Sequence, residues 1–325
     1  AGTAGGSLKA LFEVRDGDNL ENFKGKVTKA DSYSLTVENI SIDNIKSLNL
    51  PDKDGKITVN NISYSYDSWE AQVDAQGNIK SVTFNLSKDK AIADPEKTVA
   101  EGYLLNAGSA INARGIPYYM TQLNEFVRNF SEMFNQIESK GQNLNGDTPP
   151  TFFEAITSTA KVYDFSESEA YSKLPDGQTA TINSSSNTYY RMTAANFSVN
   201  KDVMNDVSLF ATATDYVKTD SCDIVDELKK LQSEKTVYRG DKAESFLETI
   251  ISNVSVDTEK AETYNKLYSN LEQTIANQRT SVSGVDEDEE ALNLVKFQYS
   301  YNMASKIISV MNQMLDKLIN DTGVA

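Results

Sequence analysis

The chain has 325 residues, which is enough for two or three domains with cores of their own. Its 47 acidic and 31 basic side chains give a formal net charge of -16, which argues against nucleic acid and against an anionic membrane surface as partners. The absence of histidine and the presence of one cysteine, Cys222, exclude histidine-dependent catalysis, histidine-ligated zinc and an intrachain disulfide. We expect no catalytic residue, no cofactor and no metal site.

No signal peptide is visible, and no apolar run approaches the roughly 20 residues that a membrane-spanning helix needs. The chain begins Ala-Gly-Thr without a methionine. We therefore expect a fragment of a longer protein that does not enter a membrane.

The first third of the chain changes from a helical to a strand-like period. Gly6–Arg15 has the apolar spacing of a short helix. From Gly25 to about Thr98 apolar and polar residues alternate, and turn residues separate the runs at Asp52–Gly55, at Asn60-Asn61 and at Asp74–Asn78. This pattern predicts an antiparallel β-meander of about five strands, inserted between helices. Its alternating apolar residues are Tyr33, Leu35, Val37, Ile57, Val59, Ile62, Tyr64, Tyr66, Trp69, Ala71, Val73, Val82, Phe84 and Leu86.

Two short acidic motifs resemble parts of calcium loops. Asp52-Lys53-Asp54-Gly55 lacks a third early carboxylate and a glutamate at the twelfth position. A hairpin turn explains it better, and the same holds for Asp16 and Asp18.

The helical period returns after Pro95. Tyr103–Arg114 is predicted as a helix, Gly115-Ile116-Pro117 breaks the chain, and Tyr118–Lys140 is predicted as a longer helix with Pro117 in its first turn. The longer helix has an apolar stripe that we assign to a protein core. The stripe consists of Tyr119, Leu123, Phe126, Phe130, Met133 and Ile137.

Residues 142–200 are polar and rich in turn residues, which predicts loops with a second small β-region. Helices follow at Asp223–Leu231, Asp241–Val254 and Thr258–Thr280, and the turn Ser281–Val285 then reverses or kinks the chain. The third of these helices has apolar or long side chains at heptad steps, namely Tyr264, Tyr268, Leu271, Ile275 and Gln278.

The last helix, Ala291–Ile319, should be roughly 50 Å long. Asp286 and Glu289 have the spacing of a capping box, and the acidic residues around them suit the helix dipole. Burial of its heptad seam would stabilise the protein by roughly 10–20 kcal/mol before opposing terms, because each large apolar side chain contributes about 1.5–3 kcal/mol. Periodicity alone allows two interpretations, a helix buried in the core of its own domain or a helix that meets other chains. The seam is Leu294, Phe297, Tyr301, Ala304, Ile308, Met311, Leu315 and Leu318.

Several stretches resemble the flagellar axial proteins, and in particular the hook-associated proteins among them. They are Ser281–Glu290, Leu294–Tyr301, Ile308–Asn320, Gly5–Leu11, Gly115–Tyr119 with Leu123–Phe126, and Ala194–Asn200. The resemblance spans most of the chain in order. It departs from the family at the start, because the N-terminal helices that complete the family's rod are missing, and residues 25–100 look like an insertion that depends on lineage.

This resemblance implies a structural subunit rather than an enzyme. It implies an extracellular protein of the bacterial flagellum that is exported without a cleaved signal peptide and forms a ring between hook and filament. The implied partners are copies of itself, the hook protein, the second hook-associated protein and an export chaperone on the C-terminal helices, with no nucleic acid and no membrane. An uncovered apolar seam is an aggregation hazard, which fits the need for a chaperone. We expect the assembly surface at Leu294, Phe297, Tyr301, Ile308, Met311, Leu315 and Leu318.

The predicted fold class is α+β, with an elongated, coiled-coil-like helical domain, an inserted antiparallel β-meander domain and a second loop and strand region. The predicted divisions are 1–24 (first helical part), 25–101 (β-domain), 102–141 (second helical part), 142–222 (irregular and β) and 223–325 (C-terminal helical rod).

Three other functions stay open from the residues. A different axial protein, such as the second hook-associated protein, the filament cap or a flagellin-like subunit, shares the C-terminal pattern. A surface adhesin would bind glycans on a platform of Trp69, Tyr64 and Tyr66, although these rings also suit the meander core. A hydrolase with two carboxylates is the weakest alternative, because the sequence singles out no acidic pair.

Overall fold

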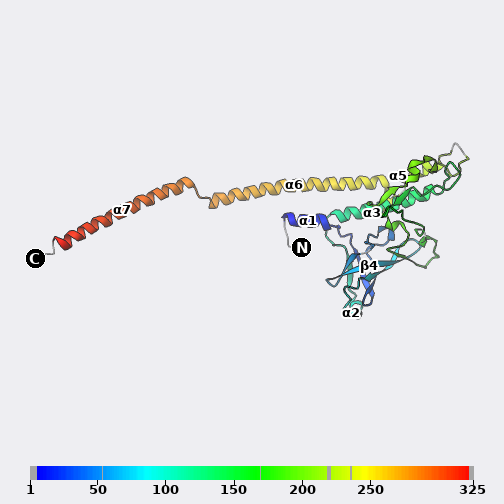
Figure 1. Ribbon diagram of the computed structural model, residues 1–325, viewed down its shortest axis with the longest axis horizontal. Coiled ribbons are helices and arrows are strands. Elements are labelled where there is room, and N and C mark those ends of the chain that lie inside the picture. The colour runs from blue at the N-terminus through cyan, green and yellow to red at the C-terminus, as the bar shows by residue number, and fades with distance from the viewer. Residues whose placement is uncertain (1–5, 53, 169, 218–220, 235, 322–325) are drawn as a thin grey trace. The chain divides into compact units, whose positions relative to one another are not determined.

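The computed structural model describes residues 6–52, 54–168, 170–217, 221–234 and 236–321. The chain divides into two compact units, Ala1–Ile251 and Ser252–Ala325. The first unit contains all the strands, and the second contains the later part of helix α6 together with helix α7 (Figure 1). The predicted α+β class is confirmed.

The β-structure of the first unit is a closed barrel. Its six strands are β1 (Phe23–Ala30), β2 (Ser34–Glu38), β3 (Gly55–Val59), β4 (Ile62–Val73), β5 (Ile79–Leu86) and β6 (Leu104–Ala107). All pair antiparallel in the order β3-β6-β1-β2-β5-β4, and β4 pairs with β3 to close the ring. The later part of β4 also pairs with β8 (Ala180–Asn183). The sheet order therefore differs from that of a simple meander, because β2 lies beside β5 and not beside β3.

The turns between strands follow the predicted turn chemistry. Asn60 and Asn61 both have positive φ, 47° and 61°, which is the backbone of a two-residue hairpin turn between β3 and β4. Asp74 accepts hydrogen bonds from the backbone N–H groups of Gln76 and Asn78, which closes the turn before β5. The predicted turn at Asp52–Gly55 includes Lys53, which lies outside the described residues.

Large aromatic side chains fill the barrel. Trp69, Tyr66 and Phe84 are fully buried, and the rings of Tyr66 and Phe84 lie 5.1 Å apart. The indole N–H of Trp69 and the hydroxyl of Tyr66 both donate to the carbonyl of Pro51, so their polar atoms are satisfied inside the core. Tyr64 is buried as well. Because these rings are enclosed, they offer no exposed stacking platform for a glycan.

The predicted helix at Tyr103–Arg114 is wrong. Strand β6 occupies its first part, with Leu105 and Ala107 pointing into the barrel and Leu104 exposed. Gly102 and Gly108 bracket the strand with positive φ of 58° and 95°, which a continuous helix would not tolerate. The apolar spacing of so short a segment fits the helical and the strand period equally well. Pairing with β1 and β3 makes this segment a strand.

Seven α-helices and several short elements make up the rest of the described chain. The helices are α1 (Gly6–Asp16), α2 (Pro95–Ala100), α3 (Ile116–Glu138), α4 (Lys201–Asn205), α5 (Asp223–Ser233), α6 (Ala243–Ser283) and α7 (Glu287–Asn320). The three-residue 3-10 turns are η1 (Ile45–Ser47), η2 (Tyr171–Lys173), η3 (Tyr189–Arg191) and η4 (Val207–Leu209). The remaining strands pair two by two, β7 (Phe153–Ala155) with β9 (Phe197–Val199) and β10 (Thr236–Tyr238) with β11 (Asp241–Lys242).

Helix α6 joins two helices that the sequence predicts separately. No glycine or proline stands between Val254 and Thr258. The hydroxyl of Thr258 donates to the carbonyl of Val254 one turn earlier, at 2.7 Å, so this threonine continues the helix and does not cap a new one. The backbone ladder therefore runs without a break from Ala243 to Ser283.

Four of the six residues of the apolar stripe predicted on α3 lie in a second core. Its Phe126, Phe130, Met133 and Ile137 pack with α5 and with the start of α6. The ring of Phe126 stacks on that of Phe246, with centroids 5.2 Å apart. After α3 the chain turns at Gly141, where a β-carbon would lie only 2.6 Å from Ala211 and 2.9 Å from Ile224. This second core fixes the first turns of α6 on the body of the unit.

Glu138 is a buried carboxylate beside this core. Its side chain is 1% exposed, and neither carboxylate oxygen has a well-aligned hydrogen-bond partner among the described residues. Burial raises the pKa of Glu138 to about 7, and the backbone N–H of Ala211 lowers the pKa again only in part. The folded chain therefore favours the protonated form.

We expect the stability of the first unit to fall as the pH rises from about 4.5 to about 7. The unfolded chain releases the proton of Glu138 near pH 4.5, whereas the folded chain holds it to about 7. At about 1.4 kcal/mol for each pH unit, ionisation costs the folded state roughly 3 kcal/mol. Glu138→Gln should remove most of this loss at pH 8 and change little at pH 4.5, as measured by urea unfolding at both values. Equal effects of the substitution at the two pH values would contradict this assignment.

Candidate assembly surface

Helix α7 begins at a well-formed cap. The side chain of Asp286 accepts hydrogen bonds from the backbone N–H groups of Asp288 and Glu289, at 3.0 Å and 3.4 Å. Four acidic residues occupy the first turn and Lys317 lies in the last, so both ends match the helix dipole. The local sequence thus explains why a helix starts at Glu287 without help from tertiary contacts.

The seven residues predicted as the assembly surface all lie on α7 and are between 50% and 75% exposed. At 3.6 residues per turn they fall within an arc of about 120° on the helix circumference. We call this arc the seam. It consists of Leu294, Phe297, Tyr301, Ile308, Met311, Leu315 and Leu318, together with the small Ala304 on the same arc.

A second apolar face adjoins the seam. Its members are also exposed and cover a further arc of about 120°. They are Leu292, Val295, Tyr299, Met303, Ile307, Val310 and Met314. The polar arc that remains is roughly 100° wide and holds Gln298, Asn302, Ser305 and Ser309. Lys296, Lys306 and Lys317 also lie within the arc of this second face, so the seam is the more continuously apolar of the two.

The part of α6 that lies in the second unit has a narrower apolar stripe. Five exposed side chains fall within an arc of about 100°, which is the width that one partner helix covers. They are Tyr264, Leu267, Tyr268, Leu271 and Ile275. Between residues 252 and 321 the structure describes no buried side chain, so α7 does not fold back on α6 to cover either stripe. The two helices differ in the number of neighbours that they need.

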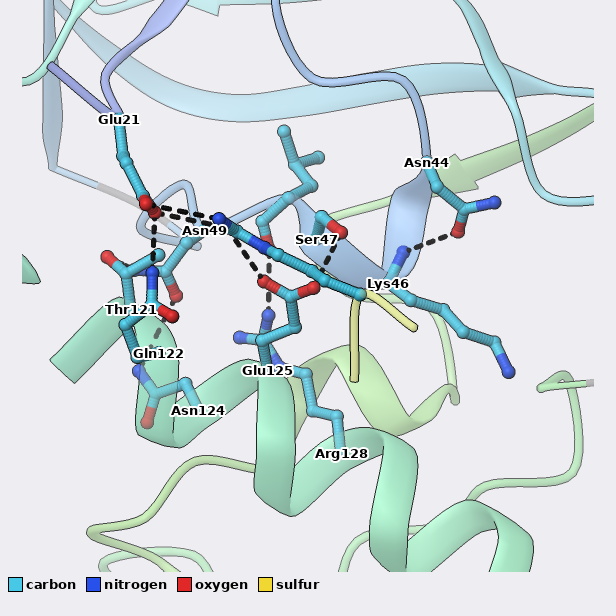
Figure 2. Close-up of polar contacts among 12 residues, drawn as sticks. Glu21, Asn44, Lys46, Ser47, Asn49, Thr121, Gln122, Asn124, Glu125 and Arg128 are labelled. Atoms are coloured by element: carbon cyan, nitrogen blue, oxygen red, sulfur yellow. Dashed lines mark hydrogen bonds and ion pairs between the residues drawn. The ribbon is translucent and has the colours of Figure 1, made fainter. Parts of the chain in front are cut away.

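Polar contacts of the preceding hairpin add to the second core in holding the start of α6. The hairpin of β10 and β11 precedes α6 and turns at Arg239 and Gly240, both with positive φ. Arg239 donates two hydrogen bonds to Glu21, at 3.1 Å and 3.0 Å, and one to Glu125, at 3.2 Å. Glu21 also accepts from Gln122 at 2.8 Å (Figure 2). Charge-assisted pairs of this kind fix the position of the hairpin against α3.

The same face of α3 binds the barrel through polar groups. Glu125 accepts from the hydroxyl of Ser47 at 2.7 Å, and the carboxamide of Asn49 donates to Thr121 at 3.0 Å (Figure 2). Glu132 pairs with Lys46 at 2.7 Å. These residues were not predicted as functional, but their signal is present in the sequence, because Thr121, Glu125, Glu132 and their neighbours recur at helical steps opposite the phenylalanines.

Two acidic side chains near the start of the chain, Asp18 and Glu21, are engaged in hydrogen bonds and ion pairs. Asp18 accepts from the N–H groups of Leu20, Ser109 and Ala110, and Glu21 is occupied by Arg239 and Gln122. In the part of the chain that the structure describes, no group of three histidine, cysteine or acidic residues is arranged to hold a metal ion. No described helix combines the length and the apolar content needed to cross a bilayer.

Comparisons with known proteins connect this surface with the flagellum. Residues 276–321, which include the end of α6, the link and all of α7, match the family described as flagellar basal body rod FlgEFG protein C-terminal. Flagellar hook-associated protein 1 of Bacillus subtilis (strain 168) is 33% identical over 78 residues, which cover 23% of this chain and 15% of that protein. Both matches are to flagellar structural proteins and not to enzymes. They support a structural role in the flagellum.

We expect α7 to exchange its backbone amides rapidly in the isolated chain. A helix with no covered face is marginal in water, so its protection factors at residues 292–319 should stay below about 10. Helix α3, which is buried on two sides, is the control within the same sample and should be protected at least about a hundredfold more strongly. Equal protection of α7 and α3 would mean that the seam is covered within a single chain.

Proposed function

We propose that this chain belongs to a hook-associated protein of the first type, which joins the hook of the flagellum to its filament. One observation carries the proposal. The segment that matches the rod family, residues 276–321, is also the segment with the widest uncovered apolar surface. A monomer that exposes both faces of α7 gains stability when copies surround it.

The mechanism is mechanical. Identical subunits pack around an axis through heterologous contacts, in which the seam of one copy meets a different face of its neighbour. The seven seam residues form one contact, and the second apolar face of α7 forms another. Residues 223–325 act as the rod of the assembly, and the domain at 25–101 belongs to a barrel that has its own core and is completed by β6 from later in the chain. Coiled-coil packing between the rods of neighbouring copies transmits load.

The surface chemistry also fits the proposed partners. The hook protein and the second hook-associated protein adjoin the ring of copies, and an export chaperone covers the C-terminal helices before assembly. The physical reason for a chaperone is that fifteen large apolar side chains on α7 are exposed, which is an aggregation hazard before assembly. Export without a cleaved signal peptide and an extracellular position at the hook–filament junction complete this proposal.

Another axial protein is the second candidate, and the family match itself favours it. The matched family is described for rod proteins, and its match is confined to the C-terminal residues that axial proteins share. Localisation separates the candidates. Immunogold labelling of the barrel in isolated flagella should place this chain between hook and filament, whereas labelling along the rod or at the filament tip would assign it to another member.

Ile308→Asp should abolish incorporation, because it places a charge in the middle of the seam. The full-length protein carrying this substitution is expressed in cells that lack the gene for the unmodified protein. Filaments are then counted by electron microscopy, and swimming is measured. We expect bare hooks, filament subunits released into the medium and a loss of swimming of at least about tenfold, because an unpaired charge in an apolar contact is costly.

Ser309→Asp is the matched control. It adds the same charge one residue later, on the polar arc of α7, and should leave filaments and swimming unchanged. Circular dichroism of both variants checks that the barrel stays folded. Normal filaments on Ile308→Asp cells, or equal defects in the two strains, would refute the role of the seam.

A further inference from the structure

Three segments of the first unit, 142–147, 203–209 and 213–217, meet beyond the last turn of α3. The backbone N–H of Gln142 donates to the carbonyl of Ala213 at 2.9 Å, and that of Leu144 donates to the carbonyl of Ser208 at 3.1 Å. Large apolar side chains on these segments are between 47% and 80% exposed, and we call them the loop patch. The loop patch consists of Leu144, Met204, Val207, Tyr216 and Val217.

Local contacts hold the loop patch in place. Asp206 accepts a hydrogen bond from the backbone N–H of Ser208 at 3.0 Å and thereby caps the turn that carries Val207. Gly146 has a φ of 79° and lies so close to Tyr216 that a β-carbon would be 2.7 Å from the ring. The apolar side chains are therefore fixed at the surface. A group of this kind marks a surface that binds another protein.

The border of the loop patch is acidic. Asp147, Asp206 and Asp215 belong to the same three segments, which contain no lysine and no arginine. Lys201 and Asp202, at the start of α4, offset each other. A protein surface that covers the loop patch should therefore combine apolar and basic side chains on one face.

The second apolar face of α7 has this combination. Lys296, Lys306 and Lys317 lie within its arc, and no acidic residue between Leu292 and Lys317 does. The acidic first turn of α7 lies close to Lys296 in sequence, and Asp316 is next to Lys317, so Lys306 has the least acidic surroundings. The exposed apolar residues of this face around Lys306 are Met303, Ile307 and Val310.

We propose that the loop patch of one copy binds the second apolar face of α7 from a neighbouring copy, around Lys306. The two surfaces differ, so the contact is heterologous, and each copy can offer both surfaces to different neighbours. This inference rests on the proposed assembly of copies through α7. It adds the surface that receives the face of α7 lying outside the seam.

Charge reversal tests the pairing in the full-length protein, expressed in cells that lack the gene for the unmodified protein. The side chain of Asp147 forms no hydrogen bond with a described residue, so Asp147→Lys should leave its loop folded. Asp147→Lys and Lys306→Asp should each lower the number of filaments at least about fivefold, because like charges then meet at the contact. The double variant should recover most of the loss, because the opposite charges meet again.

Asp176→Lys is the matched control for the change of charge. It lies in an exposed loop before β8, outside the loop patch, and should leave the number of filaments unchanged. The proposal is wrong if either single variant builds normal filaments, or if the double variant is no better than the single variants.

Cross-linking in isolated flagella identifies what covers the loop patch. Cys222→Ser removes the natural thiol, which is exposed, and Val207→Cys with Val310→Cys then places one thiol on each proposed surface. A short bismaleimide should join the copies into products longer than dimers, whereas either cysteine alone should give no product longer than a dimer. A cross-link confined to one chain would mean that α7 covers its own loop patch. The absence of cross-links would mean that another protein covers it, and either result would overturn the proposal.

The same strains separate this inference from the proposed function. If Ile308→Asp removes the filaments while Asp147→Lys leaves them intact, only the contact at the loop patch is wrong. If neither substitution affects the filaments, assembly through α7 is wrong as well.

Discussion

Arg128 holds the first unit together. This arginine is buried on α3, donates to the carbonyls of Leu48 and Met192 at 2.7 Å and 2.9 Å, and lies 4.3 Å above the ring of Tyr190. The hydroxyl of Tyr190 in turn binds both backbone groups of Leu50. The planar guanidinium group forms hydrogen bonds that depend on direction as well as on distance. Its contacts with two carbonyls and a ring therefore fix one orientation of the barrel on α3. The hydrophobic cores on either side of α3 do not need to touch.

Helix α3 therefore has two buried faces of different chemistry. Its phenylalanines belong to the core with α5 and α6, and its amides and carboxylates meet the barrel. This division explains how one unit combines a β-barrel with an unbroken helix that leaves it. The barrel is complete without the helices, because it has its own core and no unpaired edge between its six strands. Function can then reside in the helices without disturbing the barrel.

The sequence predicts those features that depend on local period and on turn chemistry. The stripe of α3, the turn at Asn60 and Asn61 and the helical state of α7 all follow from residues close together in the chain. Closure of the barrel does not, because β6 pairs with β1 and β3 far away in the sequence, and Leu104–Ala107 is too short to reveal its period. The contact of Arg239 with Glu21 joins residues 218 positions apart, and no sequence pattern around either residue predicts it.

The acidic first turn of α7 has a consequence for any assembly about a common axis. Asp286 and the four residues after it are all acidic, and they are tolerated in one chain because they face the positive end of the helix dipole. Symmetry would place the same group of carboxylates from every copy at one height, as a closed circle of negative charge. The mutual repulsion of that circle falls off over a screening distance of about 8 Å at physiological ionic strength and about 30 Å at 0.01 M. Low ionic strength therefore opposes the assembly of copies into a closed ring, whereas dissolved salt favours it because counterions screen the repulsion.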